Sequence, residues 1–174
     1  MSSFPQSAAR RVPAGQGPVT WFNGDIYRIP LAASETGGEI GVVEATVPPG
    51  GGPAPHVHER SDETFYVITG EVEFLLDQQT FLIHPEDVVF VPRGVLHRFH
   101  NSGIRPATLL FTYTPGGPEG LFIEGGDPPI PGTQVQPWGP ERIDDRLLGL
   151  LAKYDTALPS AAAVRDFQSE HDRV

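Results

Sequence analysis

The sequence predicts an all-β protein, a sandwich or barrel of short strands followed by one C-terminal helix. Its 174 residues include 20 glycines and 19 prolines, which are abundant turn formers. Between these turns lie many short segments rich in β-branched and aromatic residues, and few long apolar runs. This pattern is typical of all-β proteins rather than of alternating strands and helices. The length suits one domain with a full hydrophobic core.

About eight to ten strands are expected. Asn23-Gly24 is a strong hairpin turn between the first two, and Pro48-Pro49-Gly50 ends the third. No repeat of solenoid length is visible. The segments with strand character are 19–22, 25–29, 41–47, 64–69, 71–76, 80–83, 88–91 and 107–113.

The C-terminal part changes in composition. Residues beyond Thr114 are rich in Gly and Pro, and we interpret them as a long connection. One amphipathic helix is expected over 141–154, packed on the outside of the barrel rather than taking part in a site. Residues beyond Pro159 fit either a second short helix or a frayed tail. Pro140 suits the first turn of the main helix, and its apolar stripe is Ile143, Leu147, Leu150, Leu151 and Tyr154.

The chain therefore divides into three expected segments. They are a flexible N-terminal arm over 1–18, a β-barrel over 19–136, and a helical segment over 137–174 packed on the barrel. The arm is rich in Ser, Ala, Gly and Pro, and we expect it to lie over the domain or over a dimer partner. Because exposed strand edges need covering, a homodimer is expected.

Composition and charge exclude some classes of function. The net charge of −10 and the pI near 4.9 argue against nucleic acid as a partner, because phosphates need a basic surface. The acidic residues are scattered, which favours a role in solubility. The absence of cysteine excludes disulfides and thiolate ligands and fits a reducing compartment. The N-terminal stretch lacks the apolar core of a signal peptide, and no stretch reaches membrane-spanning length, so we expect a cytoplasmic protein without membrane contact.

Two stretches carry candidate metal ligands. His56, His58 and Glu63 lie within eight residues of one another, and His97 lies in a second stretch beside Pro92 and Gly94. Imidazole nitrogens with a carboxylate oxygen suit a divalent transition metal (Fe, Ni, Mn, Co or Zn) rather than calcium or magnesium. The remaining histidines are weaker candidates: His84 adjoins a turn, His100 faces away from His97, and His171 lies in the tail.

Strand geometry tests this spacing. His56 and His58 are two residues apart and therefore point to the same side of a strand. Glu63 breaks the parity, so a turn must lie between His58 and Glu63. On the strand that follows, Glu63, Phe65 and Val67 share the metal-facing side. By the same alternation Phe99 points inward with His97, while Arg98 and His100 point outward.

Both stretches resemble the signature motifs of the cupin superfamily. Gly50, His56, His58, Glu63 and Gly70 have the spacing of the first motif, and Pro92, Gly94, His97 and Asn101 that of the second. In the second motif, the position six residues before the proline is usually Gly and here is Glu86. The wider resemblance, from about Trp21 to Tyr154, is to single-domain cupins similar to quercetin 2,3-dioxygenase.

This resemblance implies a double-stranded β-helix, or jelly-roll, barrel with a C-terminal helix. It implies that His56, His58 and His97 bind a divalent transition metal, and that Glu63 is a ligand, a catalytic base or both. Four aromatic residues are candidates either for substrate contacts or for core filling. They are Phe65, Phe99, Phe111 and Tyr113.

Three functions fit this reading. The first is a metal-dependent oxidoreductase, a quercetinase-like dioxygenase that uses O₂ on an aromatic or enolic small molecule. The second is a metal-dependent isomerase, cyclase or lyase of small-molecule secondary metabolism. The third is a non-catalytic cupin that binds a small molecule. The fold by itself selects none of these.

Overall fold

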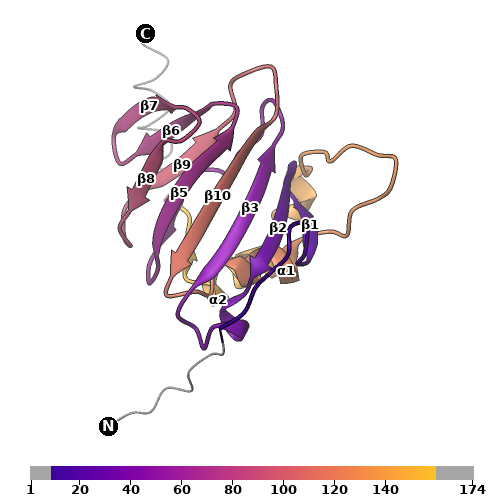
Figure 1. The fold of residues 1–174 in the computed structure, drawn as a ribbon. Coiled ribbons are helices and arrows are strands. Elements are labelled where there is room, and N and C mark those ends of the chain that lie inside the picture. Colours follow the sequence, from indigo (N-terminus) through magenta and orange to yellow (C-terminus); the bar gives the residue numbers. More distant parts are fainter. Residues whose placement is uncertain (1–8, 160–174) are drawn as a thin grey trace.

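We describe residues 9–159 from a computed structural model (Figure 1). The strands form a six-stranded sheet, a three-stranded sheet and one two-stranded pair, and every pairing is antiparallel. The six-stranded sheet has the order β1 (Val19–Phe22), β2 (Asp25–Leu31), β3 (Gly41–Val47), β10 (Ala107–Thr114), β5 (Asp62–Thr69) and β8 (Val88–Val91). The three-stranded sheet has the order β7 (Gln79–Ile83), β6 (Val72–Leu76) and β9 (His97–His100), and β11 (Thr156–Ala157) pairs with β4 (Val57–His58).

This architecture is an all-β jelly-roll barrel with a C-terminal helix, as the sequence predicts. All eight expected strand segments are present, within two residues at their ends. The described residues hold eleven strands, and the number exceeds the expected eight to ten because β4 and β11 have only two residues each. Asn23 and Gly24 both have positive φ, as the hairpin between β1 and β2 requires.

The core lies between the two larger sheets. Alternate residues of β3, β5 and β10 are buried, so that one face of each strand points inward. Burying each large apolar side chain contributes roughly 1.5–3 kcal/mol to folding. The largest fully buried apolar side chains are Phe65, Phe74, Phe111, Ile29, Leu75 and Leu109.

One helix, α1 (Glu119–Gly125), lies in the stretch that the sequence suggested was a Gly/Pro connection, so that interpretation was wrong there. The helix forms because tertiary contacts outweigh its poor helix propensity. Glu119 is buried and accepts hydrogen bonds from the backbone nitrogens of Ala33, at 2.6 Å, and Gly117, at 2.8 Å. Leu121 and Phe122 are buried on the same helix.

The expected C-terminal helix exists but is shorter than predicted. It is α2 (Asp145–Lys153), preceded by a 3₁₀ turn over Pro140–Arg142. Asp144 caps the helix, since its side chain accepts a hydrogen bond of 2.9 Å from the backbone nitrogen of Leu147. A further 3₁₀ turn covers Ala33–Glu35.

Part of the expected arm and of the tail lies outside the described residues, which begin at residue 9 and end at residue 159. This applies to residues 1–8, to the short helix considered beyond Pro159, and to His171. Within the arm, the backbone oxygen of Pro18 accepts a hydrogen bond of 2.9 Å from Ile29 in β2. None of the described helices has the length and hydropathy needed to cross a membrane.

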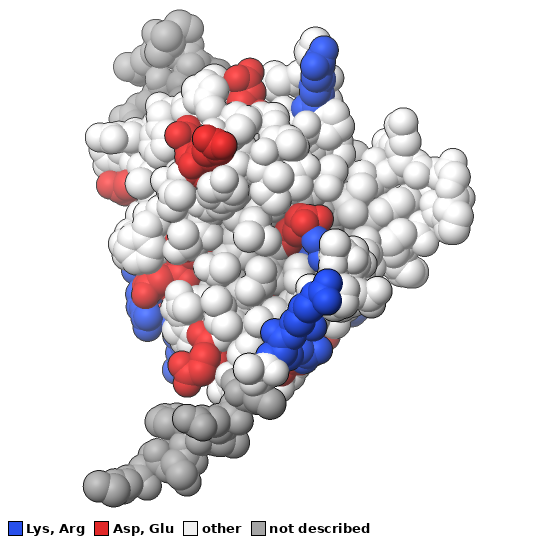
Figure 2. All heavy atoms as spheres, viewed as in Figure 1, with Lys and Arg blue, Asp and Glu red and all other residues white. Residues whose placement is uncertain are grey.

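The surface in Figure 2 carries separate acidic and basic side chains with uncharged areas between them. This distribution agrees with the scattered acids of the sequence. Several exposed apolar residues lie on β5 and β8 at one edge of the large sheet. They are Tyr66, Ile68, Val88 and Phe90, with 40%, 41%, 64% and 56% of their surface exposed.

Candidate metal centre

Backbone hydrogen bonds hold the two motif stretches together. His56 and His97 exchange two backbone hydrogen bonds of 3.0 Å, and the nitrogen of Gly94 donates to the oxygen of His58 at 2.9 Å. The chain turns between β4 and β5, as the spacing of His58 and Glu63 predicts. Both stretches therefore place their candidate ligands at the same end of the barrel.

The four expected ligands form one cluster. His56, His58, Glu63 and His97 each offer one ligand atom, and these atoms lie within 4.8 Å of one another. His58, Glu63 and His97 are at most 4% exposed, whereas His56 is only partly buried. Three imidazoles and one carboxylate at this separation could hold a divalent transition metal ion.

The hydrogen bonds behind the imidazoles orient them for metal binding. The Nδ1 atoms of His56 and His97 lie 2.9 Å and 3.0 Å from the carbonyl oxygens of Ala54 and Val95. A carbonyl can only accept, so both Nδ1 atoms carry the proton, and Nε2 of His56 is left to bind a ligand. Nε2 of His97 donates to Glu63 and would bind a metal after losing that proton.

His58 is oriented by a hydrogen bond to a residue near the C-terminal end of the described segment. Its Nδ1 lies 3.2 Å from the Thr156 hydroxyl, which donates to the backbone oxygen of Tyr154 and can therefore accept from His58. This arrangement also leaves Nε2 of His58 facing the cluster. The sequence reading missed Thr156, because 98 residues separate it from His58 and only the pairing of β11 with β4 joins them.

Glu63 completes the cluster. Its Oε2 lies 2.8 Å from Nε2 of His97 and 3.3 Å from Nε2 of His58. The contact with His58 lacks hydrogen-bond geometry, so this buried nitrogen has no hydrogen-bond partner among the described residues. A metal ion at the centre of the cluster would satisfy it, and the donor set therefore fits such an ion.

The pKa values of the cluster residues reflect their burial and their closeness to one another. Burial alone would raise the pKa of Glu63, but the charges of His58 and His97 and the hydrogen bond of His97 outweigh it and lower that pKa. Burial lowers the pKa of His56 well below its usual value, and the charges of His97 and His58 lower it further. Burial also opposes the charged form of His97, but its hydrogen bond to Glu63 raises the pKa overall. Glu63 is thus ionised and His56 neutral, the forms that bind metals.

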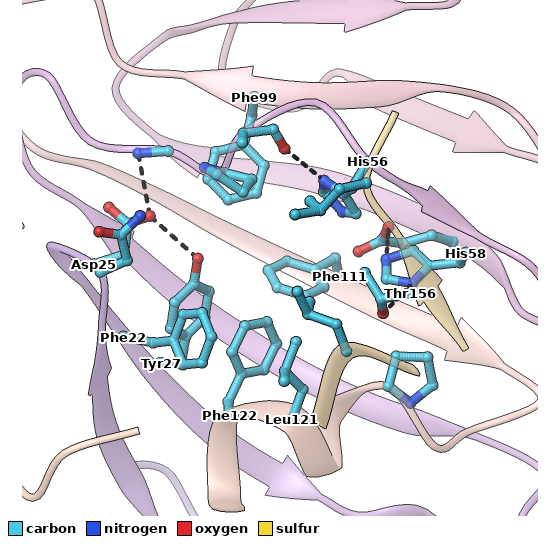
Figure 3. Close-up of a pocket in the computed structure, with 18 of the residues that line it drawn as sticks. Phe22, Asp25, Tyr27, His56, His58, Phe99, Phe111, Leu121, Phe122 and Thr156 are labelled. Carbon is cyan, nitrogen blue, oxygen red and sulfur yellow. Dashed lines mark hydrogen bonds and ion pairs between the residues drawn. The ribbon is translucent and has the colours of Figure 1, made fainter. Parts of the chain in front are cut away.

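A pocket opens beside the cluster, with His56 and His58 at one side in Figure 3. The four aromatic candidates all line it, and all are at most 3% exposed, so they are core residues and pocket residues at once. His58 lies edge-on to Tyr113 with ring centroids 5.0 Å apart. The four are Phe65, Phe99, Phe111 and Tyr113.

The helices also reach this pocket. We expected the C-terminal helix to pack on the outside of the barrel rather than take part in a site. Leu147 and Leu151 of α2 line the pocket together with Leu121 and Phe122 of α1. The apolar stripe is visible in the sequence, but nothing local to it shows which surface it covers. Asp25 and Tyr27 of β2 are further lining residues that the sequence reading did not single out as functional.

His84 and His100, the weaker candidates among the described histidines, lie outside the cluster. His84 is exposed beside Glu71 and Asp87, with nearest nitrogen–oxygen distances of 3.8 Å and 3.6 Å. His100 points to the outward side of β9. Glu86, which departs from the motif, adopts φ of 77°, the left-handed conformation that glycine favours. The turn therefore keeps the conformation expected of a glycine there.

The fold and the cluster define a jelly-roll protein with a site of three histidines and one glutamate. The cupin domain family matches residues 43–113, which include all four candidate ligands. The chain belongs to the cupin family.

Several relatives are known by name. The chain is 35% identical over 97 residues to protein SchB of Streptomyces halstedii, covering 55% of this chain and 69% of that protein. It is 32% identical over 90 residues to polyketide synthase CurC of Streptomyces cyaneus, covering 52% of this chain and 57% of the other. It is 29% identical over 115 residues to quercetin 2,3-dioxygenase of Bacillus subtilis, covering 66% of this chain and only 34% of that protein.

A solved structure supports the fold. The polyketide cyclase RemF of Streptomyces resistomycificus matches with a TM-score of 0.53 and 21% identity, covering 62% of this chain and 80% of that one. At this identity the similarity supports the barrel fold alone.

Proposed function

We propose that the protein is a metal-dependent enzyme acting on an aromatic or enolic small molecule, with quercetinase-like dioxygenation as its reaction. The observation that carries this proposal is the cluster of three Nε2 atoms and one carboxylate beside an aromatic pocket. A bound divalent ion would supply Lewis acidity toward an enolic or phenolic oxygen and, if redox-active, a site for O₂ chemistry.

The protein's own residues have separate parts in this proposal. His56, His58 and His97 would hold the ion, with their Nδ1 atoms fixed by Ala54, Thr156 and Val95. The aromatic walls would bind a flat substrate and exclude water.

Glu63 would accept the proton of the substrate hydroxyl. Its lowered pKa keeps it ionised near neutral pH, as a proton acceptor must be. The buried phenol of Tyr113 stays protonated beside it, because burial and then the negative charge of Glu63 raise its pKa. Glu63 is therefore the group of this pair that is available to take a proton.

A cyclase, isomerase or lyase reaction is the second candidate. The similarity to polyketide synthase CurC favours it as much as the similarity to quercetin 2,3-dioxygenase favours oxygenation. A non-catalytic binding cupin is the third, since the same pocket could bind a ligand without turnover.

An oxygen-electrode experiment separates these functions. Protein loaded in turn with Fe, Ni, Mn, Co or Zn is mixed with quercetin and other phenolic compounds, and substrate loss is measured beside O₂ uptake. Dioxygenation predicts one O₂ consumed per substrate lost, and no loss after chelation. Substrate loss without O₂ uptake would move the assignment to the cyclase, isomerase or lyase class, and binding without loss to a binding cupin.

A further inference from the structure

A second polar group lies in the pocket, away from the metal cluster. Figure 3 shows Asp25 on the side opposite His56 and His58. Asp25 and Tyr27 are 1% and 2% exposed. Oδ2 of Asp25 accepts hydrogen bonds of 3.1 Å from both the Tyr27 hydroxyl and the backbone nitrogen of Gly52.

Burying this carboxyl group is costly. Burial raises the pKa of Asp25 to about 7, against the opposing hydrogen bonds of Tyr27 and Gly52. Its Oδ1 is buried and has no hydrogen-bond partner among residues 9–159. A buried carboxyl with an unpaired oxygen costs free energy, so it calls for an explanation.

Glycines make room for the buried carboxyl group of Asp25. A Cβ at Gly51 would lie 2.4 Å from Oδ1 of Asp25, so a side chain at this position would collide with the carboxyl. The glycines that begin the first motif stretch thus enclose Asp25, while the same stretch continues to His56 and His58. One segment of chain therefore shapes both polar ends of the pocket.

Aromatic rings connect the two ends. Ring centroids are 5.0 Å apart between His58 and Tyr113, 5.7 Å between Tyr113 and Phe111, and 6.4 Å between Phe111 and Tyr27. Tyr27 stacks on Phe122 at 4.0 Å, which fixes its ring and leaves the hydroxyl as its polar contact. A flat molecule along this wall would reach the cluster at one end and Tyr27 at the other.

We propose that Asp25 and Tyr27 form a second recognition point, at which the Tyr27 hydroxyl hydrogen-bonds an oxygen substituent on the far end of the substrate. The proposal rests on the proposed function, which puts the enolic or phenolic end of that substrate at the metal cluster. Asp25 is a positioning residue, because it orients the Tyr27 hydroxyl. Since its carboxyl exchanges a proton near neutral pH, the pair can offer the substrate either a donor or an acceptor.

Two flavonols test this proposal as a matched pair. Kaempferol and galangin share the enol and keto oxygens that a metal would bind, and differ by one hydroxyl on the far phenyl ring. Their affinities are measured at pH 7 by calorimetry on Zn²⁺-loaded protein, since zinc has no redox chemistry. The proteins are wild type, Asp25→Ala, which removes the acceptor for the Tyr27 hydroxyl, Tyr27→Phe and the surface control Glu71→Gln, each checked for folding by thermal unfolding.

We expect wild type and Glu71→Gln to bind kaempferol about tenfold more tightly than galangin, the effect of one hydrogen bond in a buried site. Both pocket variants should bring this ratio close to one. A general loosening of the pocket would weaken both flavonols alike and leave the ratio unchanged, which would contradict the proposal. Binding of both flavonols to wild type without discrimination would overturn the second recognition point alone, and absence of all flavonol binding would overturn the proposed substrate class with it.

Discussion

The buried carboxyl of Asp25 gives the stability of the protein a distinct pH dependence. Its pKa rises from 3.8 to about 7 on folding, mainly because burial disfavours the charged form. Between these values the folded state binds the proton that the unfolded state has lost, so stability falls as pH rises. Across the whole interval the loss is about 4 kcal/mol, at roughly 1.36 kcal/mol per pH unit. Between pH 5.5 and 8.5 alone it is about 2 kcal/mol.

Asp25→Asn removes this titration and keeps an oxygen that can accept from Tyr27 and Gly52. Urea unfolding of both proteins is measured with a chelator present, so that metal binding does not contribute. The free energy of unfolding of the variant, minus that of wild type, should increase by about 2 kcal/mol from pH 5.5 to 8.5. Other titrating groups cancel in this difference. A difference that stays constant over this range, or decreases, would refute the reasoning.

Two further predictions concern Glu63 and assembly. Glu63→Gln should keep much of the bound metal, because three imidazoles remain. Its turnover should fall by about 10² to 10⁴-fold, because an amide cannot accept the proton. Parallel loss of metal and activity, measured on the same samples, would instead show a purely structural carboxylate. The chain should form a homodimer, with a mass of twice 18.8 kDa in light scattering, and Phe90→Asp on the exposed side of β8 should weaken it. A wild-type mass near 18.8 kDa at micromolar concentration would contradict the dimer.

Much of the barrel and the cluster could be predicted from sequence because strand alternation is a local rule. The parity of His56, His58 and Glu63 required a turn, and the structure has one between β4 and β5. The same rule placed Phe65 and Phe99 inward, where both are buried.

The features that the sequence did not reveal depend on contacts between distant segments. Helix α1 forms in a Gly/Pro-rich stretch because Glu119 bonds the backbone at Ala33, 86 residues away. Thr156 reaches His58 only through the pairing of β11 with β4. In the sequence, Asp25 is an ordinary residue after a hairpin turn. It is buried because Gly51 and Gly52, which are distant in sequence, pack against it.

Metal content tests the central claim most directly. Protein purified without an affinity tag is analysed for divalent metals in wild type, His58→Ala, His97→Ala and the exposed control His84→Ala. We predict about one ion per chain in wild type and in the control, and a strong loss in the other two variants, because each leaves an open coordination position. Unchanged metal content in both His58→Ala and His97→Ala would contradict the assignment of the cluster as a metal centre.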